Sequence, residues 1–337
     1  MMNKILRAKI TRMLVVNACL LVCVILKPTL VKADTNETNY SVQTHTYKTV
    51  GDCKIQLTAF RNPGSGIRPA LLYIHGGGFV LAGRMDIVPG YVERFLDAGF
   101  VMVSIDYRLA PEIKLKAILE DLADAHKWLR TEGARLFAID PVRIAVVGES
   151  AGGYLALMAG FCFDPRPKAL VSFYGFGDIT GDWCNRTNTQ PKTSSSSVSK
   201  EEAYRAVYGP VLTGTSYEDT KRDAFRRYCA QQGIWIREVT GRDPRVEPQA
   251  FALLCPIRNV TSDYPTTMLL HGDRDESVPF QESLNMAEAL KRHGVKCDLV
   301  TATNGVHGFD WYDGGLRNPA NAAIFHRVLN FLKTNTK

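Results

Sequence analysis

One serine lies in a setting that points directly to chemistry. Ser150 stands inside a Gly-Glu-Ser-Ala-Gly stretch at 148–152, between an apolar run at 143–147 and an expected helix at 154–161. Glycines on both sides permit a turn so tight that larger side chains would collide, and such a turn lifts the serine hydroxyl above the sheet. The pattern predicts a nucleophilic serine on a nucleophile elbow. An ordinary strand-to-helix turn is the alternative.

A serine hydroxyl becomes a strong nucleophile only when a base removes its proton and a third group orients that base. Two later strand ends supply these groups. The apolar run at 267–270 leads to Asp275, and the run at 296–301 leads to His307. The chain order serine, acid, histidine is the order expected with this turn. We therefore predict three catalytic residues: Ser150, Asp275 and His307.

The sequence offers rivals for the acid and for the base. Asp273 lies two residues before Asp275, and we expect it to hold the turn through local hydrogen bonds. Of the seven histidines, only His307 follows the last predicted strand after the acid and stands beside a glycine. The others lie in the polar start of the chain, in expected helices or at strand ends: His45, His75, His126, His271, His293 and His326.

Three successive glycines at 76–78 follow His75 and the apolar run at 70–74. Backbone N–H groups without side chains around them can point at an oxygen on which negative charge develops. With the amide of Ala151, those of Gly77 and Gly78 are predicted to form an oxyanion hole. A glycine-rich turn or a phosphate cradle is the weaker alternative, because the spacing of the known phosphate loops is missing.

Short apolar runs alternate with helical patterns through most of the chain. This alternation predicts an α/β fold with a mostly parallel central sheet flanked by helices. Ligands of such sheets bind at the carboxyl ends of the strands, where the predicted elbow lies. Strands are expected at 55–60, 70–74, 100–105, 144–147, 169–173, 267–270 and 296–301, and helices at 91–98, 117–132, 281–293 and 320–333.

A long stretch, about 179–264, interrupts this alternation before the strand that carries the acid. It holds scattered Pro and Gly, two short helical pieces and several aromatic residues, among them Trp183, Tyr217 and Trp235. Long loops inside compact domains are rarely idle, and the aromatic residues favour packing. We predict a lid-like insertion that covers the strand ends or forms a wall of the substrate pocket. A partly disordered surface excursion is the alternative.

The amino-terminal 33 residues have a basic start, an apolar run at 13–26 and a small residue, Ala33, at the end. This is typical of a signal peptide cleaved after Ala33, which predicts a secreted or periplasmic protein. A membrane anchor is the alternative, but the apolar run is short of the roughly 20 residues that span a bilayer.

Residues 34–50 are expected to be a polar lead-in with little core. Without the first 33 residues the formal charge falls from +7 to +1, so no nucleic-acid partner is predicted.

Six cysteines follow this segment, and none are spaced as Cys-x-x-Cys, so no metal site is predicted. An exported protein could pair some of them. The alternative is burial as small hydrophobic residues, expected especially for Cys162. The six are Cys53, Cys162, Cys184, Cys229, Cys255 and Cys297.

The motifs at 75–78 (His-Gly-Gly-Gly), 106–112 (Asp-Tyr-Arg-Leu-Ala-Pro-Glu) and 148–153 (Gly-Glu-Ser-Ala-Gly-Gly), with Asp275 and His307, resemble the α/β-hydrolase superfamily. More narrowly, they resemble the esterases of its hormone-sensitive-lipase-like branch, over about residues 55–333. The acid loop at 273–279 and the insertion before the acid strand are more similar to secreted carbohydrate and feruloyl-type esterases.

The resemblance implies a carboxylic-ester hydrolase that works through an acyl-enzyme, without a metal or organic cofactor. It implies the triad Ser150, Asp275 and His307 and the oxyanion donors Gly77, Gly78 and Ala151. The expected substrates are small-molecule or carbohydrate esters, with short-chain or acetylated groups. A serine peptidase or amidase of the same fold and a non-catalytic binding protein stay as alternatives. The oligomeric state is left open.

Overall fold

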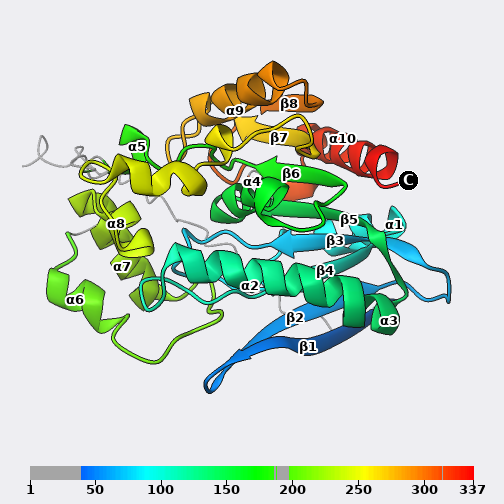
Figure 1. Cartoon of the computed structure of the whole chain (residues 1–337), viewed down its shortest axis with the longest axis horizontal. Helices are drawn as coiled ribbons and strands as arrows, with labels where there is room; N and C mark the ends of the chain where they lie inside the picture. Colours follow the sequence, from blue (N-terminus) through cyan, green and yellow to red (C-terminus); the bar gives the residue numbers. More distant parts are fainter. Residues whose placement is uncertain (1–38, 186, 188–196, 313) are drawn as a thin grey trace, which may run out of the picture. The chain divides into compact units, whose positions relative to one another are not determined.

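The computed structural model describes residues 39–185, 187, 197–312 and 314–337. Eight strands form one sheet in the order β1-β2-β4-β3-β5-β6-β7-β8 (Figure 1). The pairs β1–β2 and β2–β4 are antiparallel, and all other neighbours are parallel. The predicted α/β fold with a mostly parallel sheet is confirmed. The strands are β1 (Ser41–Val50), β2 (Cys53–Arg61), β3 (Arg68–Ile74), β4 (Val101–Ile105), β5 (Ile139–Glu149), β6 (Ala169–Phe173), β7 (Thr266–Gly272) and β8 (Cys297–Ala302).

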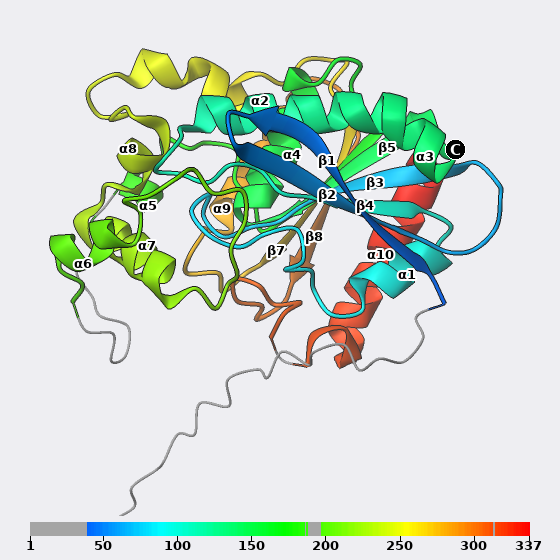
Figure 2. The ribbon, with the colours of Figure 1, turned by 90° about the horizontal axis from the view of Figure 1, so that it is seen from below.

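Helices cover both faces of this sheet (Figure 2). One face packs against α2 (Leu115–Trp128), α4 (Ala151–Cys162) and α9 (Gln281–Arg292), and the other against α1 (Tyr91–Asp97) and α10 (Pro319–Asn335). Successive strand side chains point to opposite faces, so Leu72 joins one hydrophobic core and Leu71 the other. Burial on both faces explains why the central strands are continuous apolar runs. The π-helical turn η1 (Leu129–Gly133) and the short helix α3 (Ala134–Phe137) lead from α2 into β5.

The predicted polar lead-in is wrong for residues 41–50, which form the edge strand β1 and pair with β2. Only Tyr47 of this strand is buried, and its hydroxyl donates a 2.7 Å hydrogen bond to the carbonyl of Asp106. An edge strand with so little buried surface can be polar along most of its length, so its composition resembles that of a loop. The predicted signal peptide at 1–33 lies outside the described residues.

The insertion between β6 and β7 folds into short helices that gather at one end of the sheet (Figure 1). Its side chains Phe225, Ile236 and Phe251 are fully buried. The described part of this stretch is therefore packed and is not a loose surface excursion. Its elements are α5 (Asp182–Asn185), α6 (Lys200–Arg205), α7 (Thr220–Gln232), α8 (Trp235–Thr240), η2 (Pro248–Leu254) and η3 (Pro256–Arg258). A further turn, η4 (Gly315–Arg317), precedes α10.

All six cysteines of the described chain are unpaired. The expected burial of Cys162 is wrong, because this residue ends α4 and its side chain is exposed where the helix leaves the core. Among the described residues, no helix has both the length and the apolar content needed to cross a bilayer.

Candidate active site

Ser150 occupies the sharp turn between β5 and α4. Its φ of +54° lies in the left-handed region, which residues other than glycine rarely adopt. This conformation costs roughly 1–3 kcal/mol. Two backbone hydrogen bonds hold it there: Ser150 N–H donates to the carbonyl of Phe173 at 2.9 Å, and Tyr154 N–H donates to the carbonyl of Ser150 at 3.0 Å. The serine thus stands in the strand–turn–helix context expected of a nucleophile elbow.

Close packing behind the turn explains one of its glycines. A Cβ atom on Gly152 would lie 2.1 Å from the carbonyl oxygen of Ile74 in β3. Any larger residue would push the first turn of α4 away from the sheet. The glycine therefore allows the close approach that sets the height of Ser150 above the strand ends.

The structure brings Ser150, Asp275 and His307 together from three separate loops. His307 Nε2 lies 2.9 Å from Ser150 Oγ, and His307 Nδ1 lies 2.7 Å from Asp275 Oδ2. The Asp275 side chain is fully buried, whereas the His307 side chain is 26% exposed. A substrate can therefore reach the imidazole, while the carboxylate is shielded from water.

Asp275 accepts hydrogen bonds from three groups, and a second imidazole lies beside it. The amides of Ser277 and Val278 donate to Oδ1 at 2.8 and 2.9 Å, and His271 Nε2 lies 3.2 Å from Oδ2. Burial alone would raise the pKa of Asp275, but hydrogen bonds from His271 and His307 outweigh it and hold the pKa well below its usual range. The carboxylate therefore stays charged when His307 takes up a proton.

The contact of His271 with Asp275 was not predicted from sequence. His271 is the last residue but one of β7, four residues before the acid, and its Nδ1 lies 2.7 Å from Ser283 Oγ. The Ser283 hydroxyl can donate to Nδ1, which places the imidazole proton on Nε2. This nitrogen lies 3.0 Å from the carbonyl oxygen of Val278 and 3.2 Å from Asp275 Oδ2, so its proton points between the two oxygens. The one available signal was the short spacing between His271 and the acid. Asp273, the rival acid, is exposed.

The predicted oxyanion loop follows β3. Gly77 and Gly78 have φ of +84° and +61°, and a Cβ on Gly77 would lie 2.0 Å from the carbonyl oxygen of Leu81. Within the part of the chain that the structure describes, the amides of Gly77 and Gly78 donate no hydrogen bond. Ala151 is the first residue of α4, where helix geometry leaves N–H groups without an internal partner. All three amides are therefore available as donors.

The insertion contacts this loop directly. Trp235 Nε1 donates to the carbonyl of Gly78 at 3.0 Å, and Ala82 N–H donates to Thr215 Oγ1 at 3.1 Å. The buried guanidinium of Arg222 donates to the carbonyl of Val80. Helices α7 and α8 thus bind the loop through its backbone carbonyls. No local pattern in the sequence marks Arg222 or Trp235 for this contact.

A sequence-family comparison matches residues 60–290, more than half of the chain, to the family described as BD-FAE. The chain belongs to the BD-FAE family. The matched range begins in β2 and ends in α9, so it includes the elbow, the acid loop and the whole insertion.

Solved structures and a curated relative extend this result. An α/β-hydrolase superfamily protein from Enterococcus faecalis has a TM-score of 0.67 and 20% identity, over 88% of this chain and 98% of that one. An esterase from Pyrobaculum calidifontis has a TM-score of 0.65 and 25% identity, over 89% and 86%. A non-reducing polyketide synthase of Stereocaulon alpinum is 28% identical over 319 residues, which are 82% of this chain but only 13% of the synthase. The predicted α/β-hydrolase fold is confirmed.

Replacing Arg222 with methionine is expected to destabilise this BD-FAE protein by roughly 3–5 kcal/mol, since it leaves the carboxylate of Glu112 without its buried cation. The side chains of Arg222 and Glu112 are only 2% and 6% exposed. Arg226→Met, one turn later on α7, is the matched control, because its pair with Asp223 is exposed and contributes about 0–1 kcal/mol. Urea unfolding measures both. Equal losses would contradict the buried role of Arg222.

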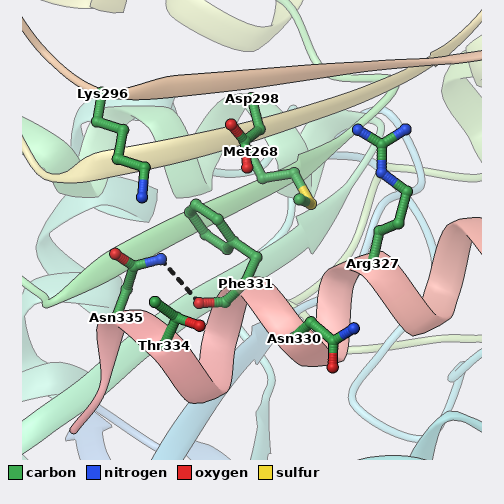
Figure 3. A pocket seen from close by; sticks show the side chains of 8 residues that line it. All are labelled: Met268, Lys296, Asp298, Arg327, Asn330, Phe331, Thr334 and Asn335. Carbon is green, nitrogen blue, oxygen red and sulfur yellow. Dashed lines mark hydrogen bonds between the residues drawn. The ribbon is translucent and has the colours of Figure 1, made fainter.

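A shallow hollow lies away from these residues, between α10 and the strands β7 and β8 (Figure 3). Lys296, directly before β8, and Arg327, on α10, are among its lining residues. None of the residues predicted for catalysis lines it. Ser150 and Asp275 follow the carboxyl ends of β5 and β7, so the predicted catalytic residues lie at the other end of the strands.

Proposed function

We propose that the protein hydrolyses carboxylic esters by acyl transfer through Ser150. The observation that carries this proposal is the continuous contact from Asp275 through His307 to Ser150, at 2.7 and 2.9 Å. His307 Nε2 takes the hydroxyl proton as Ser150 Oγ attacks the ester carbonyl, and Asp275 stabilises the imidazolium that forms. His307 then gives the proton to the departing alcohol. Water releases the acyl group by the same route.

Negative charge develops on the carbonyl oxygen as Ser150 attacks. The amides of Gly77, Gly78 and Ala151 are the proposed donors to this oxygen, because they are free in the described structure and flank the serine. Fixed donors of this kind need no rearrangement as the charge appears, and each contributes several kcal/mol in other serine hydrolases. The oxyanion loop keeps its shape partly through the contacts with Trp235 and Arg222.

For the substrate, we propose short-chain or acetylated-carbohydrate esters, with the insertion as a wall of the pocket. Trp235 stacks on Phe79 of the oxyanion loop, with ring centroids 5.7 Å apart, and Phe176 packs against Trp235 at 6.0 Å. These rings fill space beside Gly78 and favour a short acyl group. The esterase class itself agrees with the BD-FAE match and with the esterase from Pyrobaculum calidifontis.

An ester panel tests this proposal. We expect kcat/KM for acetyl and butyryl aryl esters to exceed that for the decanoyl ester by roughly tenfold or more, because a filled pocket rejects added methylenes. Acetylated xylo-oligosaccharides tested alongside should release acetate. Preferential cleavage of peptide or anilide bonds would instead indicate a serine peptidase or amidase. No turnover, together with no labelling by a fluorophosphonate probe, would indicate a binding protein.

We also propose that residues 1–33 direct export and are removed after Ala33. The basic start and the short apolar run support this. Amino-terminal sequencing of protein recovered from the medium or the periplasm should begin at Asp34. Recovery of the uncleaved chain from membranes would favour an anchor.

A further inference from the structure

Two buried carboxyl groups lie beside the catalytic contacts without a role in the proposed mechanism. Glu149 directly precedes Ser150, and Asp310 follows His307 by three residues; each is only 2% exposed. Among the described residues, neither forms an ion pair with a Lys, Arg or His side chain. Buried carboxylates without a cation are costly and need either hydrogen-bond donors or a proton.

Several donors from distant segments reach these two carboxyls. The Tyr73 hydroxyl of β3 donates to Glu149 Oε1 at 2.9 Å, and Trp311 Nε1 donates to Glu149 Oε2. The Tyr91 hydroxyl of α1 donates to Asp310 Oδ2. Each of these three groups carries one hydrogen and uses it once.

Tyr174 lies between the two carboxyls. Its hydroxyl oxygen is 3.0 Å from Glu149 Oε2 and 2.8 Å from Asp310 Oδ1. A tyrosine hydroxyl has a single hydrogen, so it can donate to only one of these oxygens. With Tyr73, Trp311 and Tyr91 there are five short contacts but four hydrogens. If all five contacts are hydrogen bonds, the fifth hydrogen lies on a carboxyl oxygen, which then donates to Tyr174.

We propose that Glu149 and Asp310 share one proton at neutral pH through the Tyr174 hydroxyl, and that this acid pair positions Ser150 and His307. The positioning role rests on the proposed ester hydrolysis, whereas the proton count does not. The pair consists of positioning residues, since neither carboxyl touches the reacting atoms.

The surroundings of the pair favour a retained proton. Burial raises the pKa of Glu149, and the nearby charge of Asp310 adds to this, so that the pKa is about 8. Burial also raises the pKa of Asp310. The pair should therefore keep one proton near pH 7 and lose it as the pH rises toward 8 and above. The titratable groups that face it are Tyr73 of β3, Tyr91 of α1, Tyr107 after β4, Tyr174 after β6, Tyr217 of the insertion and His307.

Contacts link the pair to the catalytic groups. The Tyr174 ring packs edge-on against the His307 imidazole, with centroids 4.8 Å apart, and Glu149 is covalently joined to Ser150. With one proton bound, the pair keeps one negative charge near the imidazole, which favours the imidazolium formed during attack. When the proton is lost, two carboxylates compete for one hydroxyl hydrogen and repel each other. The Tyr174 contact that supports His307 then weakens.

Infrared spectroscopy of the full chain tests the proton directly. In Asp310→Asn, the amide can donate to Tyr174 and accept from Tyr91, so Glu149 can ionise and all five hydrogen bonds persist. The difference spectrum of wild type minus Asp310→Asn at pH 7 should show the carbonyl stretch of a protonated carboxylic acid. The absence of this band would overturn the proposal. Because no ester is involved, this outcome is separate from any failure of the proposed function.

Stability measured against pH gives an independent readout. The pKa of Glu149 is raised to about 8 in the folded state. The bound proton therefore stabilises the fold in full below the pKa of the unfolded chain, near 4–5, and this stabilisation is lost as the pH rises to about 8. Wild type should therefore lose stability relative to Asp310→Asn between about pH 5 and pH 8. Parallel curves would contradict a shared proton.

Kinetics test the positioning role. Tyr174→Phe removes the shared hydroxyl and is expected to lower kcat by roughly tenfold, with KM changed by less than about twofold. The alkaline limb of the pH profile of kcat should also lie at a different pH in Tyr174→Phe than in the wild type. Tyr40→Phe is the matched control, because Tyr40 donates to Glu93 in an exposed contact away from the site. Equal kinetics for both variants, with the infrared band present, would leave the proton but refute its positioning role.

Discussion

Ser150→Ala is expected to lower kcat for ester hydrolysis by at least about a thousandfold, because no attacking oxygen remains beside His307. The fold should persist, since among the described residues Ser150 Oγ forms a hydrogen bond with His307 alone, and the backbone hydrogen bonds of the turn do not use it. Initial rates with an aryl acetate, and thermal unfolding of the same sample, measure the two effects separately.

Ser65→Ala is the control for this substitution, because Ser65 is exposed in the loop between β2 and β3. It should retain wild-type turnover and labelling by a fluorophosphonate probe, while Ser150→Ala should lose both. Undiminished hydrolysis by a folded Ser150→Ala protein would remove this serine from the mechanism.

Asp275→Asn should produce a loss of about ten-thousandfold in kcat with a smaller change in KM. If the amide oxygen replaces Oδ1, it still accepts from Ser277 and Val278, and the amide nitrogen then faces both imidazoles. His307 would have to accept at Nδ1 and carry its proton on Nε2. In that tautomer it cannot remove the proton of Ser150.

Asp273→Asn is a matched control two residues away, with the same change of side chain on an exposed position. Its kcat should stay within about twofold of wild type, because surface substitutions have small effects. A loss in Asp273→Asn as large as that in Asp275→Asn would mean that the acid has been assigned to the wrong residue. Full activity of Asp275→Asn would show that His307 is oriented by another group.

Local physical requirements explain why much of the fold and of the candidate site could be predicted. Parallel strands buried on both faces must be apolar throughout, and β3 to β7 therefore stood out as continuous runs. The elbow around Ser150 and the loop at Gly77 require glycine at fixed places, because a Cβ there would overlap a backbone carbonyl. Such requirements leave a signal within a few residues of the sequence.

Strand β1 shows where this reasoning failed. Its neighbour β2 supplies the backbone hydrogen bonds, and only Tyr47 enters the core, so hydrophobicity along 41–50 carries almost no pattern. Pairing with a partner decided its structure, and pairing is not visible in the composition of one segment.

By itself, the sequence determined the order of the strands from β2 to β8, the glycine turns and the chain order of Ser150, Asp275 and His307. Only the tertiary structure decided that His271 would support the acid and that Arg222 would enter the core beneath the oxyanion loop. It also brought Tyr91 to Asp310, 219 residues away, and so created the paired carboxyls. The physical reason is that these hydrogen bonds join segments that are far apart in the sequence. Whether two such segments come into contact depends on where the fold places their backbones, and the residue spacing within either segment does not predict it.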